Sequence, residues 1–265
     1  MKRTPIPASL FSTLAVFALW IAFAAPASAQ NYNCGTPQQN HCYGVTAWSQ
    51  TGEYFGAYSD ITVGNLNCPS GCGGFVDDEM WLSDYNSANC QSNQFGACWV
   101  EAGYLTSDGG SQVYFWADAR EGNGNTFNLH LLGGVDPTGT EDHYMIVKDG
   151  RSNPNNYLVF IYNDSQSTLY NGTNVPTNPG QMTPHNILIG QELAGSNNAS
   201  ATEVNFCRNR WATSALDGSY TFFASSQTTQ GNVRSDKPPT ASWLEVPGSM
   251  GAPDGGIFQT NCCGT

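Results

Sequence analysis

A glutamate stands at a position where the chain is otherwise built as a β-strand. Residues 98–105 read CWVEAGYL, and a second such segment, SQVYFWADAR, spans residues 111–120. Both segments are rich in valine and aromatic residues, which favour strands, whereas glutamate and glycine are depleted from strand interiors. Carboxyl groups act as general acids and bases in hydrolysis. Glu101 is therefore the first candidate for a catalytic residue.

The side chains around Glu101 predict a polar and aromatic sheet face. Side chains alternate between the two faces of a strand, so Trp99, Glu101 and Gly103 share one face. On the next segment, one face carries Tyr114, Trp116 and Asp118. If the two strands pair as a hairpin with these faces aligned, they line a substrate cleft. The alternative is an ordinary polar outer face with some aromatic residues.

Most acid chemistry of this kind needs a second carboxylate, because two close carboxyl groups share a proton. The segment SATEVNFC, residues 200–207, supplies Glu203. Further candidates are Glu192 in IGQEL, Glu245 in SWLEV and the acidic run Asp77-Asp78-Glu79. Each of them could equally be an exposed structural carboxylate.

Other catalytic and metal-binding motifs do not occur in the sequence. It contains no G-x-S-x-G, no H-E-x-x-H and no phosphate-binding glycine loop. His130, His143 and His185 have no regular metal spacing, and CPSGC has no matching Cys or His pair for zinc. We therefore expect neither a metal ion nor another cofactor.

The N-terminal residues predict export. Residues 1–29 begin with two basic residues, continue with an apolar stretch at 10–23 and end in a small-residue cleavage site. The apolar stretch is too short to favour a membrane span. We expect a secreted protein in which residues 30–265 form a single domain.

The charge balance limits the partners. Aspartate and glutamate number 21 against 9 lysines and arginines, giving a formal net charge of −12, and removal of the signal peptide makes it more negative. An acidic surface repels phosphate backbones, so we expect no nucleic-acid partner. No membrane partner is expected either, and the protein is expected to be a monomer.

The remaining pattern is typical of an all-β protein. Short runs rich in Val, Tyr, Phe and Trp alternate with clusters of Gly, Asn, Ser, Asp and Pro. We expect an antiparallel double-sheet β-sandwich, jelly-roll-like, with a concave cleft. The polar segment 163–185 is expected to be a long loop. The predicted strands are 44–48, 54–64, 75–83, 97–106, 111–119, 126–133, 142–149, 156–163, 186–193, 202–207, 219–225 and 241–246.

Nine cysteines in an exported chain indicate disulfide bonds. Neighbours in sequence that could close short loops are Cys34/Cys42, Cys68/Cys72 and Cys90/Cys98. Cys207 could pair with Cys262 or Cys263, which leaves one cysteine over. Sequence alone does not fix the connectivity.

Several segments, in order, resemble the neprosin-type glutamic peptidases. VEAGY at 100–104 resembles the family's I-E-A-G-W, and YFWAD at 114–118 resembles its T-Y-W-T-A-D. The other segments that carry the resemblance are YFGAYSDITVGN, MWLSD, IVKDGRSNPNNYLVFIYND and ATEV. The fungal eqolisins look like more distant relatives, with Gln where this chain has Glu101. IGQEL and ATEV depart from the family's G-Y-W-P and G-G-E-V.

This resemblance implies a β-sandwich that hydrolyses peptides, with Glu101 and Glu203 as the pair that activates water. Trp81 and Trp116 would line its cleft. We therefore expect a secreted, acid-acting endopeptidase that takes a polypeptide substrate, and we expect Glu101→Gln or Glu203→Gln to abolish cleavage. One alternative is a carbohydrate-active or carbohydrate-binding protein that places a polysaccharide in the same cleft. Another is a secreted binding protein without catalysis.

Overall fold

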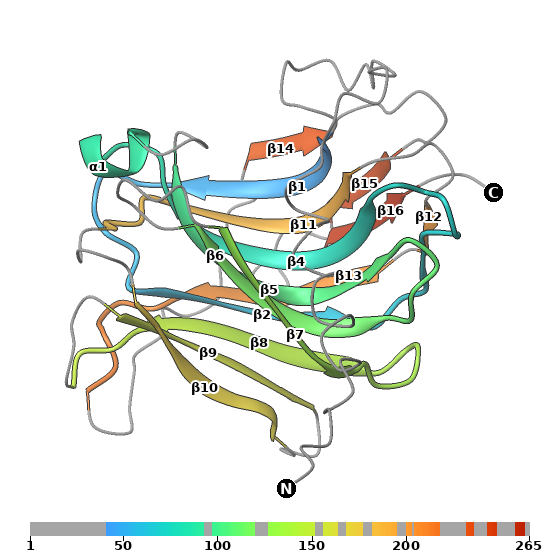
Figure 1. The fold of residues 1–265 in the computed structure, drawn as a ribbon. Coiled ribbons are helices and arrows are strands. Elements are labelled where there is room, and N and C mark those ends of the chain that lie inside the picture. Colours follow the sequence, from blue (N-terminus) through green and yellow to red (C-terminus); the bar gives the residue numbers. More distant parts are fainter. Residues whose placement is uncertain are drawn as a thin grey trace, which may run out of the picture. The chain divides into compact units, whose positions relative to one another are not determined.

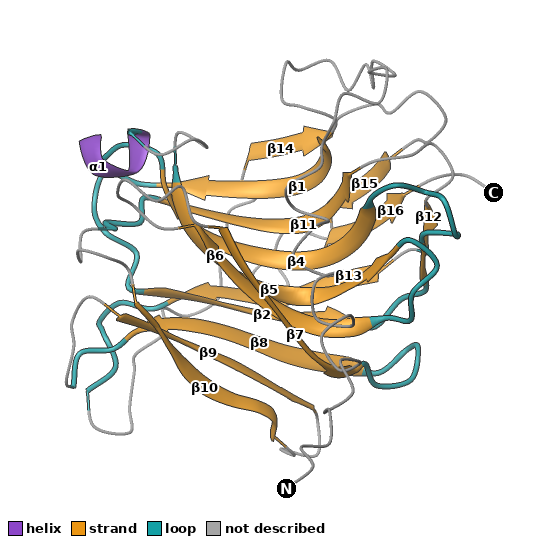
Figure 2. Ribbon diagram, viewed as in Figure 1, coloured by secondary structure: helices purple, strands orange, loops and turns teal. Residues whose placement is uncertain are grey.

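The computed structural model consists of two seven-stranded antiparallel sheets, here called sheet A and sheet B, with one short additional strand pair (Figure 1). Strands account for nearly all of its regular structure, as the colouring in Figure 2 shows. The described residues are 41–92, 97–119, 127–151, 156–163, 168–176, 182–194, 200–202, 204–217, 232–235, 243–247 and 258–262. The only helix among them is a single turn, α1 (Ala88–Gln91).

Sheet A carries the candidate glutamate, and the spatial order of its strands differs from their order in the sequence. Its strands, in spatial order, are β14 (Asn232–Ser235), β1 (His41–Ser49), β11 (Asn186–Ala194), β4 (Phe75–Asp84), β5 (Cys98–Ser107), β6 (Val113–Ala119) and β7 (Phe127–Gly134). The consecutive strands β4 to β7 form a meander, whereas β11 joins from far along the chain.

Sheet B has the same number of strands. In spatial order they are β10 (Thr168–Pro176), β9 (Asn156–Asn163), β8 (Glu141–Lys148), β2 (Gly56–Thr62), β13 (Val204–Trp211), β16 (Phe258–Cys262) and β15 (Trp243–Pro247). The additional pair consists of β3 (Leu66–Asn67) and β12 (Ser200–Ala201). Among the described residues, no helix is long and apolar enough to span a membrane.

Apolar side chains fill the space between the two sheets. From sheet A these include Met80, Leu82 and Val100, and from sheet B Ile61 and Ile146, all of them fully buried. Burial of one such side chain stabilises the fold by about 1.5–3 kcal/mol. Tyrosines add polar links across the core: Tyr114 Oη donates to Asp142 Oδ2 on β8 (2.6 Å), and Gly64 N donates to Tyr104 Oη (2.7 Å). This core fixes which face of sheet A points inward.

The predicted fold class is confirmed, since the structure is all-β with two antiparallel sheets in a sandwich. Most predicted strands match observed ones within a few residues. The prediction of a loop over 163–185 was wrong for residues 168–176, which form β10 and pair with β9 through two register shifts. The sequence of β10, TLYNGTNVP, shows no regular alternation of apolar and polar residues. It is held by backbone pairing at the edge of sheet B, which a sequence pattern does not report.

Two of the predicted disulfides are present, Cys68–Cys72 and Cys90–Cys98. Cys42 is also disulfide-bonded, and its predicted partner Cys34 lies outside the described residues. The bridge from Cys207 to Cys262 or Cys263 stays a prediction.

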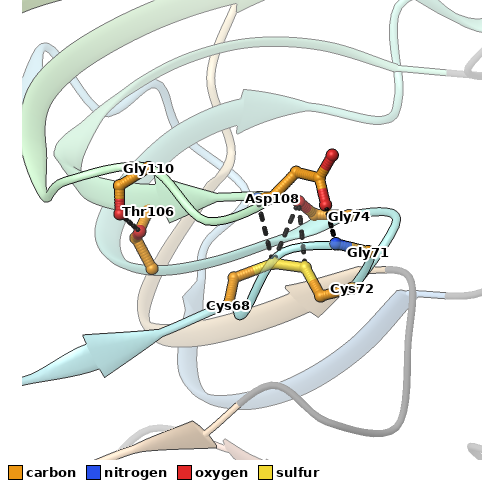
Figure 3. The surroundings of a disulfide bond; sticks show 7 residues. All are labelled: Cys68, Gly71, Cys72, Gly74, Thr106, Asp108 and Gly110. Atoms are coloured by element: carbon orange, nitrogen blue, oxygen red, sulfur yellow. Dashed lines mark hydrogen bonds between the residues drawn. A yellow bond between two sulfur atoms is a disulfide. The ribbon is translucent and has the colours of Figure 1, made fainter.

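The Cys68–Cys72 loop holds the turn between β5 and β6 (Figure 3). Gly71 N donates to Asp108 Oδ1 (2.5 Å), and Asp108 N donates to Cys68 Sγ (3.3 Å). Gly109 N donates to Cys68 O (2.6 Å) and has a φ of 76°, which glycine adopts without strain. The bridged loop therefore fixes the hairpin whose first strand carries the candidate glutamate.

Candidate active site

Four carboxyl groups lie on one face of sheet A, the face turned away from sheet B. They belong to Asp77 and Glu79 on β4, Glu101 on β5 and Glu192 on β11, and we call them the acidic patch. Directly opposed residues of an antiparallel pair share a face. The register opposes Trp81 to Glu101, Glu79 to both Gly103 and Gly190, and Asp77 to Glu192. All four carboxylate residues are buried, with exposed fractions of 1–7%.

The carboxyl groups of the patch are close together. Carboxylate oxygens of Asp77, Glu79 and Glu192 all lie within 4.8 Å of one another, and Glu192 N donates to Asp77 Oδ1 (3.1 Å). Glu101 is the diagonal neighbour of Glu79, a position whose Cα atoms are typically about 7–8 Å apart and within reach of long side chains. The patch therefore runs diagonally across three strands from Glu101 to Glu192.

Glycines flank the middle of the patch. Gly103 and Gly190 stand opposite Glu79 on the two neighbouring strands. A Cβ atom at Gly103 would lie 2.1 Å from Asp78 O, and one at Gly190 would lie 2.1 Å from Gly44 O. Glycine is therefore required for the close approach of the strands, and it also leaves no side chain directly beside Glu79.

Burial and mutual repulsion keep protons on the patch. Burial, followed by the negative charge of Glu192, raises the pKa of Glu101 to about 8, although hydrogen bonds from the indoles of Trp81 and Trp99 oppose the rise. Burial and the neighbouring carboxylates raise the pKa values of Asp77 and Glu79 well above their usual range. At acid pH these groups are protonated, which removes the cost of burying several charges side by side.

A histidine interacts with the Glu192 end of the patch. His41 Nδ1 on β1 is hydrogen-bonded to Glu192 Oε1. Burial lowers the pKa of His41, but the charge of Glu192 and its hydrogen bond raise that pKa by more. The net change in the pKa of His41 is therefore upward. Protonated His41 therefore places a positive charge beside the carboxyl group of Glu192.

Two clusters among the described residues have spacings that would suit a metal ion. One is Asp77, Glu79 and Glu192, and the other is Asp60, Glu141 and His143 on sheet B. In the second cluster the guanidinium of Arg208 donates to both Asp60 and Glu141, so a cation already neutralises it. In the acidic patch, shared protons account for the close approach of the carboxyl groups. The absence of a metal cofactor stays a prediction.

The structure divides the predicted cleft residues between two faces. Trp81 and Trp99 lie on the face of Glu101, as expected, and their indoles lower the pKa of its carboxyl group against the effect of burial.

The prediction was wrong for the other cleft residues, Tyr114, Trp116 and Asp118. The register places Ala117 opposite Glu101, so these three side chains point to the opposite face. A shift of one residue in pairing exchanges the two faces of a strand, and the sequence of two adjacent strands does not fix that shift. Tyr114 instead hydrogen-bonds across the core, and Trp116 stacks on His130 with 3.8 Å between ring centroids.

The identity of the second carboxylate depends on which strands lie near β5 in sheet A. Glu203 lies outside the described residues, and so does the side chain of Glu245. Asp78 is on the inner face, hydrogen-bonded to Tyr104. The structure brings three of the candidates, Asp77, Glu79 and Glu192, into the patch with Glu101, and Glu192 is the one that is hydrogen-bonded to a histidine. A sequence signal existed in the glycine and glutamate of IGQEL, but only the order of strands makes β11 a near neighbour.

Comparisons with known proteins give weak similarities in structure. No protein-family model matches the chain, and no curated protein matches it. One similar solved structure is Scytalido-glutamic peptidase with a peptide-based transition state analog, at 8% identity and a TM-score of 0.49, covering 84% of this chain and 98% of that one. SCP-B, a member of the Eqolisin family of peptidases in complex with a tripeptide, shares 7% identity over 84% and 98% of the two chains, with a TM-score of 0.46. Alginate lyase Aly36B in complex with alginate trisaccharide shares 13% identity over 84% and 77%, with a TM-score of 0.35. Similarities of this size assign no activity to the chain.

Proposed function

We propose that this protein is a glutamic-type peptidase that hydrolyses peptide bonds at acid pH, with Glu101 and Glu192 as its catalytic pair. The observation that carries the proposal is that these two carboxyl groups lie at the two ends of one buried patch, where the charge of Glu192 raises the pKa of Glu101. A protonated and an ionised carboxyl group in one site can serve as acid and base at the same pH.

The proposed roles follow from the surroundings of each group. Glu192, hydrogen-bonded to His41, takes a proton from a water molecule as the oxygen of that water attacks the scissile carbonyl carbon. Glu101, which keeps its proton up to about pH 8, donates a hydrogen bond to the carbonyl oxygen and stabilises the oxyanion that develops there. Glu192 then passes its proton to the leaving amine as the C–N bond breaks, and both carboxyl groups return to their starting states.

The two tryptophans position the acid. Trp81 stands opposite Glu101 and Trp99 lies two residues before it on the same face, so the two indoles flank its carboxyl group and, in this proposal, orient it. Hydrogen bonds that hold a catalytic group in place reduce the reorganisation needed in the transition state.

Isosteric substitutions test the pair. We expect Glu101→Gln and Glu192→Gln each to lower cleavage of denatured protein at pH 3–5 by about 100-fold or more, the usual range for loss of an acid or base. Glu79→Gln is the matched control, because Glu79 is protonated at that pH and the amide mimics its neutral form. Glu203→Gln tests the pair expected from sequence and should leave activity near the wild-type level. Full activity in Glu101→Gln or Glu192→Gln would remove that residue from the mechanism.

Carbohydrate hydrolysis is the second candidate. Aromatic rings beside carboxylates also bind sugars, and half-buried Trp99 lies next to Glu101, with its ring 6.2 Å from that of Phe127. Release of reducing ends from a panel of polysaccharides at pH 3–5, with no release of peptides from protein, would support this candidate over the peptidase.

The location proposed for the protein is extracellular. It is supported by the predicted signal peptide and by the two disulfides of the described chain, since such bonds persist in oxidising compartments. Detection of the mature chain in culture medium, with an N-terminus near residue 30, tests this.

A further inference from the structure

Two leucines on β7 are exposed to solvent. Leu129 is 41% exposed and Leu131 is 53% exposed, and together with Tyr85 they are the exposed large apolar side chains among the described residues. Single exposed leucines are common on protein surfaces. Two of them in alternate positions on one strand place both side chains on the same face.

That face is the face of the acidic patch. The register opposes Leu129 to Ala117 and Leu131 to Phe115 on β6, and it opposes these in turn to Glu101 and Gly103 on β5. Leu129, Ala117 and Glu101 therefore form one row across three strands. The leucines lie two strands from the proposed acid, on the side away from Glu192.

The surroundings of the leucines on this face are apolar. Phe127 occupies the same face of β7 and contacts Trp99, while Leu105, Phe115 and Ala117 form a buried apolar cluster on this face of the neighbouring strands. We call Phe127, Leu129 and Leu131 the β7 strip. It carries no charge, in contrast with the acidic patch beside it.

We propose that the β7 strip is the specificity subsite of the enzyme, where it binds an apolar side chain of an extended polypeptide substrate that crosses sheet A toward Glu101. This inference rests on the proposed peptidase function. The occupant is a polypeptide because the strip is continuous with the row that holds the proposed acid. The bound side chain is apolar because the exposed part of the strip consists only of hydrocarbon groups.

The spacing of the strands predicts which substrate residue binds to the β7 strip. Neighbouring strands lie about 4.8 Å apart, so the strip is about 10 Å from the strand of Glu101. An extended chain advances about 3.3 Å per residue. The selected side chain is therefore about three residues from the cleaved bond, on the side opposite Glu192.

Cleavage-site profiling tests the subsite. The double variant Leu129→Ser/Leu131→Ser and the wild type are each incubated at pH 4 with a mixed peptide library, and the cuts are sequenced. We expect the wild type to favour an apolar residue about three positions from the cut, and the double variant to lose about tenfold in kcat/KM on such peptides, the lower end of the range for one apolar contact. Peptides with serine at that position should be cut equally well by both proteins.

His130→Ser is the matched control. His130 lies on the same strand as the two leucines, but its side chain stacks on Trp116 on the opposite face. An equal loss of selectivity in His130→Ser would show that disturbance of the strand, and not the strip, causes the effect, and would overturn the inference.

The remaining outcomes separate the two proposals. A wild type that cuts no peptide removes the proposed function and this inference together. A wild type that cuts peptides, with an unchanged profile in the double variant, removes the subsite alone. Dimers of the wild type on size exclusion that the double variant dissociates would make the strip an interface between copies, which also overturns the inference.

Discussion

At the scale of single residues, the structure explains why a glutamate stands inside strand β5. Glu101 lies opposite Trp81 and on the same face as Trp99, and both indoles lower the pKa of its carboxyl group against the effect of burial. A buried carboxyl group that is protonated and hydrogen-bonded costs far less than a buried charge. The strand therefore tolerates Glu101 as a neutral acid, which is the form that the proposed mechanism uses.

The tryptophan contact predicts a shift in the pH profile. Trp81→Phe removes an indole N–H that lowers the pKa of Glu101, so that pKa should rise above about 8. Because Glu101 must be protonated to act, the alkaline limb of the kcat/KM profile should move to higher pH. Trp116→Phe, on the opposite face, should leave the limb in place. An unchanged or lowered limb in Trp81→Phe would argue against Glu101 as the acid.

At the scale of elements, the site depends on how closely β4, β5 and β11 approach one another. Three consecutive rows of cross-strand pairs carry the patch, and glycines occupy both places opposite its middle residue, Glu79. The Cys68–Cys72 loop fixes the turn that follows β5. The carboxyl groups therefore meet because of strand order and register, with no contribution from any helix among the described residues.

A glycine substitution tests this close approach. In Gly103→Ala the added methyl group would meet Asp78 O at 2.1 Å, so the strands must move apart. We expect the free energy of unfolding to fall by about 1–3 kcal/mol or more, the usual cost of overpacking. Gly133→Ala on β7 has nothing within 4 Å of its added Cβ and should change stability little. Urea unfolding of both variants measures the difference, and equal stabilities would contradict the packing described here.

At the scale of the whole molecule, buried acids couple stability to pH. Burial raises the pKa of Asp78 to about 7 against hydrogen bonds from Tyr104 and Gln191, and burial with the charge of Glu192 raises that of Glu101 to about 8. Between about pH 4 and these values the folded protein binds more protons than the unfolded chain. The free energy of unfolding therefore falls as pH rises through that window.

The sign of this dependence gives a prediction. The protein should be more stable at pH 4.5 than at pH 7.5, with each such group contributing at most about 1.4 kcal/mol per pH unit. Urea unfolding at several pH values measures the slope, and Glu101→Gln should reduce it because the amide does not titrate. Burial raises the pKa of Asp84, but backbone hydrogen bonds lower it by more, so the net pKa is below its usual value. Below pH 4 the trend should therefore reverse as Asp84 gains a proton. Equal or greater stability at pH 7.5 would show that the patch is not protonated as proposed.

The amino-acid sequence by itself determined the features that depend on neighbouring residues. Most of the strands, the sandwich class and the shared face of Trp99 and Glu101 follow from local composition and alternation, and short spacing made Cys68/Cys72 and Cys90/Cys98 candidate pairs that the structure confirms.

Tertiary structure alone decided which strands are neighbours and in what register they pair. It turned Tyr114, Trp116 and Asp118 away from Glu101, and it brought Glu192 on β11 next to β4. The physical reason is that these choices depend on the packing of the whole core: one residue of slip exchanges the faces of a strand, and strands far apart in sequence pair only when both sheets assemble.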